Sequence, residues 1–236
     1  MQSGNVAVMQ PYLFPYLGYF HLVTAAEEFV FYDDVHYIKQ GWINRNNILV
    51  GGKPLRFSVP IADASSFRPI KDVHVTGVER WFAKFAKTLA QAYGHAPCYT
   101  DVMPMISKVF TAPHTSIADL AIASIQETFA YLQLPFRYIR STERFPQSQG
   151  MERAERLIHI TRELELSGYV NAAGGKDLYD KPLFAKHGIH LSFVKSEAIS
   201  YPQHGGEFVP NLSIIDVLMF NTKPAVCHLL QRFSLD

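Results

Sequence analysis

The sequence has few of the features that mark secreted, membrane-spanning or nucleic-acid-binding proteins. It holds 2 cysteines, Cys98 and Cys227, which lie far apart and share no pairing motif, so we expect reduced thiols instead of a disulfide framework. The 22 Lys and Arg residues nearly balance 21 Asp and Glu residues, and the net charge of +1 gives no bulk attraction for nucleic acid. No apolar run is long enough to cross a membrane, and no charged segment precedes an apolar run near the N-terminus. We therefore expect a cytoplasmic protein.

The composition that is present suits one globular domain. The chain has 236 residues, of which 48% are hydrophobic and 18% are charged, and this is enough for one sizeable core. Strand-like segments alternate with helix-like ones from residue 136 to 194, which predicts a parallel sheet with right-handed crossovers. Gly51-Gly52 lies between two apolar runs and predicts a β-hairpin. We predict a single α/β domain over residues 1–236, with a Rossmann-like, mainly parallel sheet flanked by helices and a small antiparallel insertion near residues 40–75.

Periodicity and end signals place the individual elements. Strands are expected at residues 5–9, 29–32, 71–75, 136–140, 169–172 and 189–194. Helices are expected at residues 18–26, 77–93, 100–110, 117–132, 151–166, 176–187 and 214–221, with a further short helix from Pro224. The spacing of a helix cap or capping box occurs in three pairs, Thr76 with Glu79, Ser116 with Asp119, and Ser213 with Asp216.

The loop after the first strand, residues 10–19, is the leading candidate for a binding site. In open α/β sheets, ligands bind beyond the carboxyl ends of the strands, where this loop lies. Nucleotidyltransferase-type Rossmann folds carry a His-x-Gly-His pattern at that place, and here the chain reads Tyr16-Leu17-Gly18-Tyr19. The glycine would let an anion approach a helix start, and tyrosine can stack on a base, whereas the loss of both histidines disfavours adenylyl transfer. The predicted substrate-binding residues of this loop are Gln10, Tyr12, Tyr16, Gly18 and Tyr19. Its tyrosines fit equally well as residues packed at the edge of the core.

Asp33-Asp34 follows the second expected strand and is the candidate acidic centre. Carboxylates at a strand end suit Mg²⁺ or Mn²⁺ that bridges to a nucleotide diphosphate. Neighbouring strand residues point to opposite faces, so we expect Asp34 to reach a metal and Asp33 to act as a general base. His21, on the first helix, is the alternative base, although a histidine among apolar residues also suits a packed core. A solvated turn with a helix cap is the other interpretation of the acidic pair.

Two further segments are rich in groups that bind anions. In residues 36–46, Arg and Lys suit phosphate or carboxylate and Trp suits a sugar or base, which makes candidates of Lys39, Trp42, Asn44 and Arg45. Residues 171–176 follow a strand and are small enough to turn backbone N–H groups toward an anion, which makes candidates of Asn171, Gly174, Gly175 and Lys176. The asparagine of the first segment fits equally as a backbone partner at the hairpin entry, and the glycine pair of the second as turn chemistry.

Four segments of the chain, MQPYLFPYLGYFHLV, YDDVHYIKQGWINRN, YVNAAGG and FVPNLSIIDVLMFN, together resemble the WbqC-like protein family. The resemblance runs from the first strand to the last helix, so it covers nearly the whole chain. Members of the family lie among genes for surface polysaccharide, such as O-antigen, and unusual sugars, and some are described as glycine (aminoacyl) transferases. The resemblance implies a transferase of surface-polysaccharide or unusual amino-sugar biosynthesis that binds a nucleotide-linked or activated substrate, with aminoacyl (glycyl) transfer as one form of the reaction.

Two other functions stay open from the sequence. One is a nucleotidyltransferase-like enzyme, and the other is a non-catalytic binding or scaffold subunit of a polysaccharide pathway. The expected partner is a small molecule, either a nucleotide sugar or an activated amino acid, and no nucleic acid is expected unless aminoacyl-tRNA is the donor. Phe57 and Val59, which we expect at an exposed hairpin edge, would suit a homodimer interface.

Overall fold

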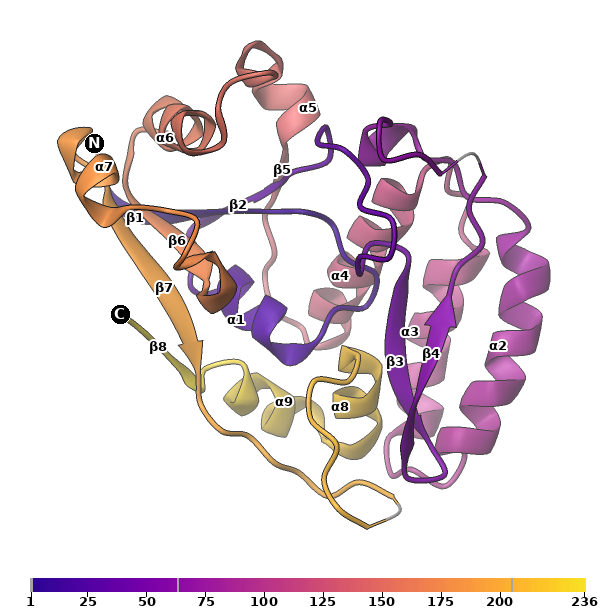
Figure 1. The fold of residues 1–236 in the computed structure, drawn as a ribbon. Coiled ribbons are helices and arrows are strands. Elements are labelled where there is room, and N and C mark those ends of the chain that lie inside the picture. Colours follow the sequence, from indigo (N-terminus) through magenta and orange to yellow (C-terminus); the bar gives the residue numbers. More distant parts are fainter. Residues whose placement is uncertain (1, 63, 205) are drawn as a thin grey trace.

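The computed structural model describes residues 2–62, 64–204 and 206–236, which fold around a six-stranded sheet (Figure 1). The strands are Gln2–Met9 (β1), Glu28–Phe31 (β2), Ile139–Arg140 (β5), Leu166–Ala172 (β6), His190–Ser196 (β7) and Phe233–Leu235 (β8). Their order across the sheet is β5-β2-β1-β6-β7-β8, and all neighbours are parallel except β7 with β8. The predicted α/β class with a mainly parallel sheet is confirmed.

The direction in which the strands are added reverses between β1 and β6. From β1 the chain moves to β2 and then β5 on one side, and later to β6 and β7 on the other. In open α/β sheets, ligands bind beyond the carboxyl ends of the strands at such a reversal. The loops that follow β1 and β6 therefore flank the place where the fold favours a site.

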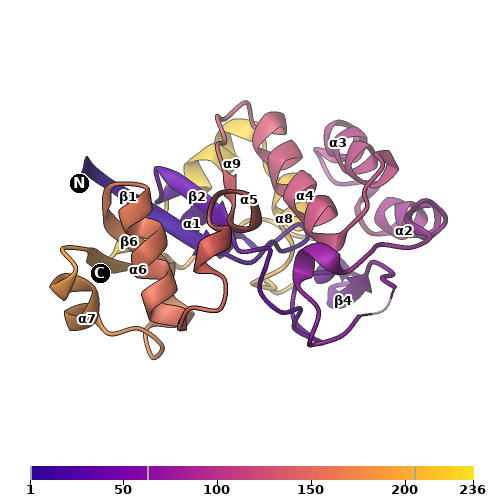
Figure 2. The same ribbon diagram turned by 90° about the horizontal axis from the view of Figure 1, so that it is seen from above.

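Helices cover both faces of the sheet, as Figures 1 and 2 show. The helices are Leu17–Thr24 (α1), Val78–Tyr93 (α2), Tyr99–Thr111 (α3), Ile117–Tyr131 (α4), Ser141–Arg144 (α5), Arg153–Glu163 (α6), Lys181–Lys186 (α7), Ile214–Phe220 (α8) and Lys223–Leu229 (α9). Val6 and Val8 of β1 enter a core shared with α6 and α7, whereas Ala7 faces the larger core with α1, α4 and α8. A strand that is buried on both faces must be apolar nearly throughout, which explains why β1 and β2 show little alternation.

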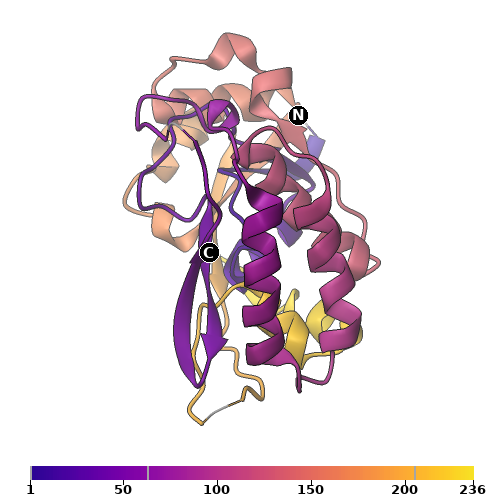
Figure 3. The ribbon, with the colours of Figure 1, turned by 90° about the vertical axis from the view of Figure 1, so that its right-hand side faces the viewer.

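The predicted hairpin is present, with β3 at Arg45–Val50 and β4 at Lys53–Ser58 (Figure 3). Gly51 and Gly52 make its turn with φ angles of 56° and 75°, a region that side chains oppose. The hairpin packs beside α2, outside the main sheet.

The hairpin does not expose the two residues expected at its edge. The Phe57 ring lies 4.6 Å from the Phe85 ring of α2, measured between centroids. Phe57 and Val59 are 5% and 1% exposed, so both belong to the core of this chain. The prediction that they form an exposed surface for a homodimer is therefore wrong.

Two further predictions of local structure, one strand and the start of one helix, are wrong. No strand forms at residues 71–75; Ile70–Asp72 is a 3-10 turn closed by the bond from Val73 N–H to the Ile70 carbonyl. The helix expected from residue 176 begins at Lys181, because Pro182 has no N–H and fits only the first turn of a helix.

One of the predicted helix caps is present and another is absent. Ser116 and Asp119 form the predicted capping box at the start of α4, with reciprocal bonds of 3.1 and 3.0 Å. Thr76 does not cap α2, because Gly77 has a left-handed φ of 58° and itself holds the N-cap position. Among the described residues, no helix is long and apolar enough to cross a membrane.

Candidate functional site

The described residues line an open pocket of about 400 Å³ at the carboxyl ends of β1 and β7. One wall is the start of α1, and the other is the loop after β7 together with α8. Figure 1 shows where these elements lie in the fold. Its lining is formed by Tyr16, Leu17, Gly18, His21, Ser196, Glu197, Ala198, Ile199, Ser200, Tyr201, Phe208, Pro210, Asn211, Leu212 and Val217. The pocket is thus mainly apolar and carries a small number of polar groups, as small-molecule sites do.

The first turn of α1 faces this pocket because of the loop that precedes it. Tyr16 holds the N-cap position with an extended backbone, and no side chain among the described residues caps the helix. The N–H group of Gly18 has no acceptor within the helix, as at any helix start, whereas an antiparallel bridge joins the backbone at Tyr16 to Ser213. A Cβ on Gly18 would lie 2.4 Å from Cε2 of Tyr16, so glycine is required for the tyrosine ring to lie over the helix start.

His21 lies one turn further along α1 and lines the pocket, although it is only 1% exposed. Its Nε2 is 2.9 Å from the carbonyl oxygen of Leu229, and its Nδ1 is 2.8 Å from Oγ of Ser196. A carbonyl can only accept, so Nε2 carries the proton and Nδ1 accepts the hydrogen bond that the serine hydroxyl donates. Burial lowers the pKa of His21 from its ordinary value of 6.5, against smaller opposing effects of the Leu229 carbonyl and Glu197. His21 is therefore neutral at pH 7, with its basic nitrogen directed at Ser196.

The tyrosines predicted for this loop divide between core and pocket. Tyr19 is 3% exposed, and its hydroxyl donates to the backbone carbonyl of Gln10 at 2.8 Å. Tyr12 packs against it with ring centroids 5.6 Å apart, whereas Tyr16 is 38% exposed and lines the pocket. Burial raises the pKa of all three phenols, so they are neutral hydrogen-bonding groups. Tyr16, with Gly18 and His21, is what the structure brings together from the predicted set.

The loop after β7 is fixed over the pocket by a buried carboxylate. Asp216 of α8 is fully buried and accepts hydrogen bonds from the hydroxyls of Tyr93 and Tyr201, both at 2.8 Å, and from Nε2 of Gln203 at 2.7 Å. Gln203 also bonds both backbone groups of Val209 in the same loop. Burial raises the pKa of Asp216, and the three donors partly offset this. The carboxylate thus ties the outer wall of the pocket to α8 and α2.

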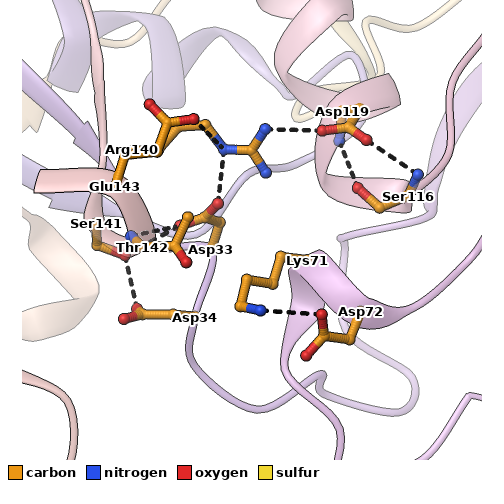
Figure 4. A network of polar contacts seen from close by, with 10 residues as sticks. All are labelled: Asp33, Asp34, Lys71, Asp72, Ser116, Asp119, Arg140, Ser141, Thr142 and Glu143. Atoms are coloured by element: carbon orange, nitrogen blue, oxygen red, sulfur yellow. Dashed lines mark hydrogen bonds and ion pairs between the residues drawn. The ribbon is translucent and has the colours of Figure 1, made fainter. Parts of the chain in front are cut away.

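Asp33 and Asp34 lie at the carboxyl end of β2, in a second polar centre that Figure 4 shows. The carboxylate of Asp33 is fully buried and accepts from Nε of Arg140 at 2.7 Å, from the Ser141 hydroxyl at 3.1 Å and from the Thr142 N–H at 3.1 Å. Arg140 reaches further, to Asp119 at 2.8 Å. The oxygens of Asp33 are therefore occupied by groups of β5 and α5.

The carboxylate of Asp34 is also buried and accepts hydrogen bonds from a hydroxyl and an arginine. It is 5% exposed and accepts from the Ser141 hydroxyl at 2.6 Å and from Nη2 of Arg156 at 2.6 Å. Arg156 lies on α6 and is itself 4% exposed. Each aspartate thus has its own arginine, and the two ion pairs join β2 to β5 and α6.

Burial and charge act against each other in this network. Burial alone would raise the pKa of Asp119, but hydrogen bonds from Ser116 and Arg140 outweigh it, and the pKa lies below 3.8. Among the described residues, no group of three or more His, Cys, Asp or Glu side chains is arranged to hold a metal ion. The metal-binding role of Asp34 stays a prediction; its contacts are an ion pair and a hydroxyl.

The predicted anion-binding residues of the 36–46 segment make contacts within that segment and its hairpin. Asn44 accepts from the Tyr37 hydroxyl and donates to the Val59 carbonyl, both at 2.9 Å, which is the hairpin-entry role considered above. Arg45 Nε donates to the Gly41 carbonyl at 2.7 Å. Lys39 is exposed and Trp42 is 41% exposed, with the Arg56 guanidinium 5.5 Å from the centre of its ring.

The segment after β6 is a turn stabilised by its own side chains. Asn171 Oδ1 accepts from the Ala172 N–H at 2.8 Å, and a Cβ on Gly175 would lie 2.7 Å from Nδ2 of Asn171. Gly174 has open space around it, and Lys176 forms an ion pair with Asp236. None of the residues predicted in the 36–46 and 171–176 segments belongs to the described lining of the pocket.

Both centres are completed by residues that no sequence pattern assigned to a site. Ser196 and Tyr201 follow an expected strand, so their place at the carboxyl edge was accessible, but their partners His21 and Asp216 lie on other elements. Arg140 and Arg156 carry no local signal, because only the tertiary fold brings them to the acidic pair.

Comparison with known proteins gives a family and no structural template. A protein of Mycobacterium tuberculosis (strain ATCC 25618 / H37Rv) named "Uncharacterized protein Rv1507c" is 26% identical over 220 residues, which cover 92% of this chain and 93% of that protein. No solved structure matches the chain. The model of the WbqC-like protein family matches residues 10–228, a range that contains the loop after β1, both aspartates, His21 and the whole lining of the pocket. The chain therefore belongs to the WbqC-like protein family.

Proposed function

We propose that this protein is a cytoplasmic transferase that acts on a nucleotide-linked or otherwise activated substrate of surface-polysaccharide or amino-sugar biosynthesis. The observation that carries the proposal is the meeting of a neutral, buried histidine and an uncapped helix start in one pocket at the carboxyl edge of the sheet. The helix start suits the anionic part of an activated substrate, since the dipole and the N–H groups at a helix start favour negative charge.

In this proposal His21 is the general base. Its Nδ1 is free of a proton and accepts from the Ser196 hydroxyl at 2.8 Å, so it takes the proton of an attacking hydroxyl or amine through that serine or in its place. Asp33 is the weaker candidate, because its carboxylate is fully buried and already accepts three hydrogen bonds. Asp33 and Asp34 then act by holding β5 and α6 against β2, at a distance from the chemistry.

The apolar wall of the pocket supports transfer over hydrolysis. Leu17, Ile199 and Phe208 line it together with the polar groups. Apolar surroundings limit water and strengthen the interaction of the helix start with an anion. Aminoacyl transfer to an amino sugar fits this environment, since an activated ester must be kept from water.

The proposal is tested by thermal unfolding in the presence of ATP, UDP-sugars and dTDP-sugars, each with and without Mg²⁺ or Mn²⁺. A ligand at a hundredfold its Kd adds about 2.7 kcal/mol, which raises the Tm by roughly 5–10 °C for a chain of this size. A shift with one nucleotide class supports an activated nucleotide-linked substrate, and a metal-dependent shift would give Asp34 its predicted role. A flat panel contradicts the nucleotide-linked substrate and favours a scaffold subunit.

A further inference from the structure

We propose that Ser196 is a nucleophile that carries an acyl group during the reaction, with His21 as its base. This inference rests on the proposed transferase function and narrows its donor to an activated acyl compound, such as an acyl adenylate, thioester or ester. It assigns a covalent role to a serine that no sequence motif marks.

The first support is the direction of the hydrogen bonds around His21. The Leu229 carbonyl fixes the proton on Nε2, so Nδ1 can only accept from the Ser196 hydroxyl at 2.8 Å. A nucleophile bonded to a base whose other nitrogen is held by a third group is the arrangement that activates serine in hydrolases and transferases.

The second support is the different exposure of the two residues. His21 is 1% exposed and its ring packs 5.5 Å from that of Phe233, so the base is held rigidly. Ser196 is exposed and lines the pocket, so a substrate in the pocket meets this residue. A buried base beside an open hydroxyl is what an acyl carrier requires.

The third support is the position of Ser196 at the end of a strand. It is the last residue of β7, at the carboxyl edge, and it pairs with Phe233 of β8. The next residue, Glu197, is held by a backbone bond to Arg232 and by an ion pair with the same residue at 2.9 Å. The backbone of Ser196 is thus held on both sides, which keeps its Oγ within hydrogen-bond distance of Nδ1 of His21.

The start of α1 completes the site. Gly18 lines the same pocket, and its N–H group has no acceptor within the helix. Such a group stabilises the negative oxygen that develops when a hydroxyl adds to an acyl carbon. The Ser–His pair supplies the independent observation that makes this helix start part of a site.

The reaction proceeds in two half-reactions that balance. Nδ1 of His21 takes the proton of the Ser196 hydroxyl while Oγ forms a bond to the acyl carbon of the donor. The bond from that carbon to the leaving group breaks, and the leaving group departs with the proton from His21. In the second half-reaction an acceptor amine or hydroxyl attacks the acyl–serine ester, its proton passes to His21, and Oγ leaves with that proton as the hydroxyl.

The test is acylation of the whole chain by p-nitrophenyl acetate, followed by mass spectrometry of the intact protein and of its peptides. We expect a burst of p-nitrophenolate and one acetyl group on Ser196. Ser196→Ala should lose the burst by roughly a hundredfold or more, as expected when a positioned nucleophile is removed. Ser234→Ala is the matched control, since Ser234 is also exposed and lies on the neighbouring strand β8, outside the described lining of the pocket.

The outcomes separate this inference from the proposed function. No acetyl group on Ser196, or an equal burst in Ser196→Ala, overturns the acyl–serine step; a Tm shift with nucleotide sugars in that same protein would leave direct transfer with His21 as base. Acetylation of Ser196 with a flat nucleotide panel would keep the acyl carrier and reject the nucleotide-linked substrate. Ser196 is exposed, so its alanine variant should fold, and a cooperative thermal transition without ligand checks this.

Discussion

Two polar centres lie at the carboxyl edge of the sheet, and they differ in what their side chains are free to do. In the network of Asp33, Asp34, Arg140 and Arg156, each carboxylate is buried and paired with a guanidinium at 2.6–2.7 Å. In the pocket, His21 has one nitrogen fixed by a backbone carbonyl and the other facing an exposed hydroxyl. The first centre has more charge, but only the second has a proton acceptor and a hydroxyl beside a pocket.

Charged residues that stand out in a sequence are therefore not always free to bind a ligand. A carboxylate whose oxygens already accept from an arginine and a hydroxyl contributes to the fold, because separating the pair would leave a charge buried. A neutral histidine beside a cavity offers a proton acceptor without that cost. The two centres should therefore respond in opposite ways to mutation, one in stability and the other in rate.

The largest effect is expected for Asp34→Ala. It leaves the guanidinium of Arg156 buried and unpaired, which costs about 3–5 kcal/mol, or a fall in Tm of roughly 10 °C. Lys108→Ala is the control: its ion pair with Glu127 is largely exposed and is worth about 0–1 kcal/mol. Calorimetry of both variants measures the difference. An Asp34→Ala protein that keeps the control's Tm and loses its ligand would move the site to the network.

An effect of comparable size, on the activation free energy instead of on stability, is expected for His21→Gln. Removal of a general base lowers the transfer rate by about 10²–10⁴-fold, while substrate affinity changes little. Rate and affinity are measured separately, with circular dichroism as a check on the fold of this buried site. A variant that keeps its rate would exclude His21 as the base.

The pH dependence of the same reaction follows from the sign of the His21 shift. The folded pKa lies below the ordinary 6.5, because burial disfavours the charged ring and Glu197 opposes this only in part. The rate should therefore be level at neutral pH and fall as the pH falls through the lowered pKa. The stability that comes from burying a neutral ring is present above pH 6.5 and is lost as the pH falls below it. A rate that rises on acidification would contradict this.

A smaller effect on stability is expected for Tyr201→Phe, which removes one hydrogen-bond donor to the buried Asp216. Gln203 and Tyr93 still bond that carboxylate, so the cost should be about 1–3 kcal/mol, as for one lost partner of a buried polar group. Hydrogen exchange in residues 197–204 should rise, since the loop loses part of its attachment to α8. Equal exchange in Tyr201→Phe and wild type would mean that the carboxylate does not hold the pocket wall.

The smallest effect is expected for Arg45→Ala. Arg45 donates to the Gly41 carbonyl and is not part of the described lining of the pocket. Ligand affinity should change by less than about 0.5 kcal/mol, the range of substitutions away from a site. Titration calorimetry with the ligand found in the thermal panel measures it. A loss of 1.5–3 kcal/mol, as for a charged hydrogen bond of about that strength, would return Arg45 to the site.

Local chemistry made much of the fold predictable. The Gly51-Gly52 turn and the Ser116 capping box need only neighbouring residues, and both are confirmed. The Thr76 cap failed because a left-handed glycine took the N-cap position, which residue spacing does not reveal. Strand β8 was not expected, since its three residues form a strand only by pairing with β7.

Of the two walls of the candidate site, only the one formed by α1 and the loop before it could be predicted. The place of Tyr16, Gly18 and His21 follows from the rule that ligands bind at the carboxyl edge. The partner of His21, Ser196, is 175 residues away along the chain, and nothing local links the two. The paired state of Asp33 and Asp34 likewise depends on arginines more than 100 residues away, contributed by β5 and α6.

The claim that the substrate lies between α1 and the loop after β7 is tested most directly by filling that space. Ala198 lines the pocket and is exposed, so Ala198→Trp should occupy the cavity without disturbing the core. Ala173→Trp places the same side chain at the exposed turn after β6, outside the described lining. We predict that the Tm shift caused by the best nucleotide sugar disappears in Ala198→Trp and persists in Ala173→Trp. The reverse pattern would place the ligand at the turn after β6 and contradict the account.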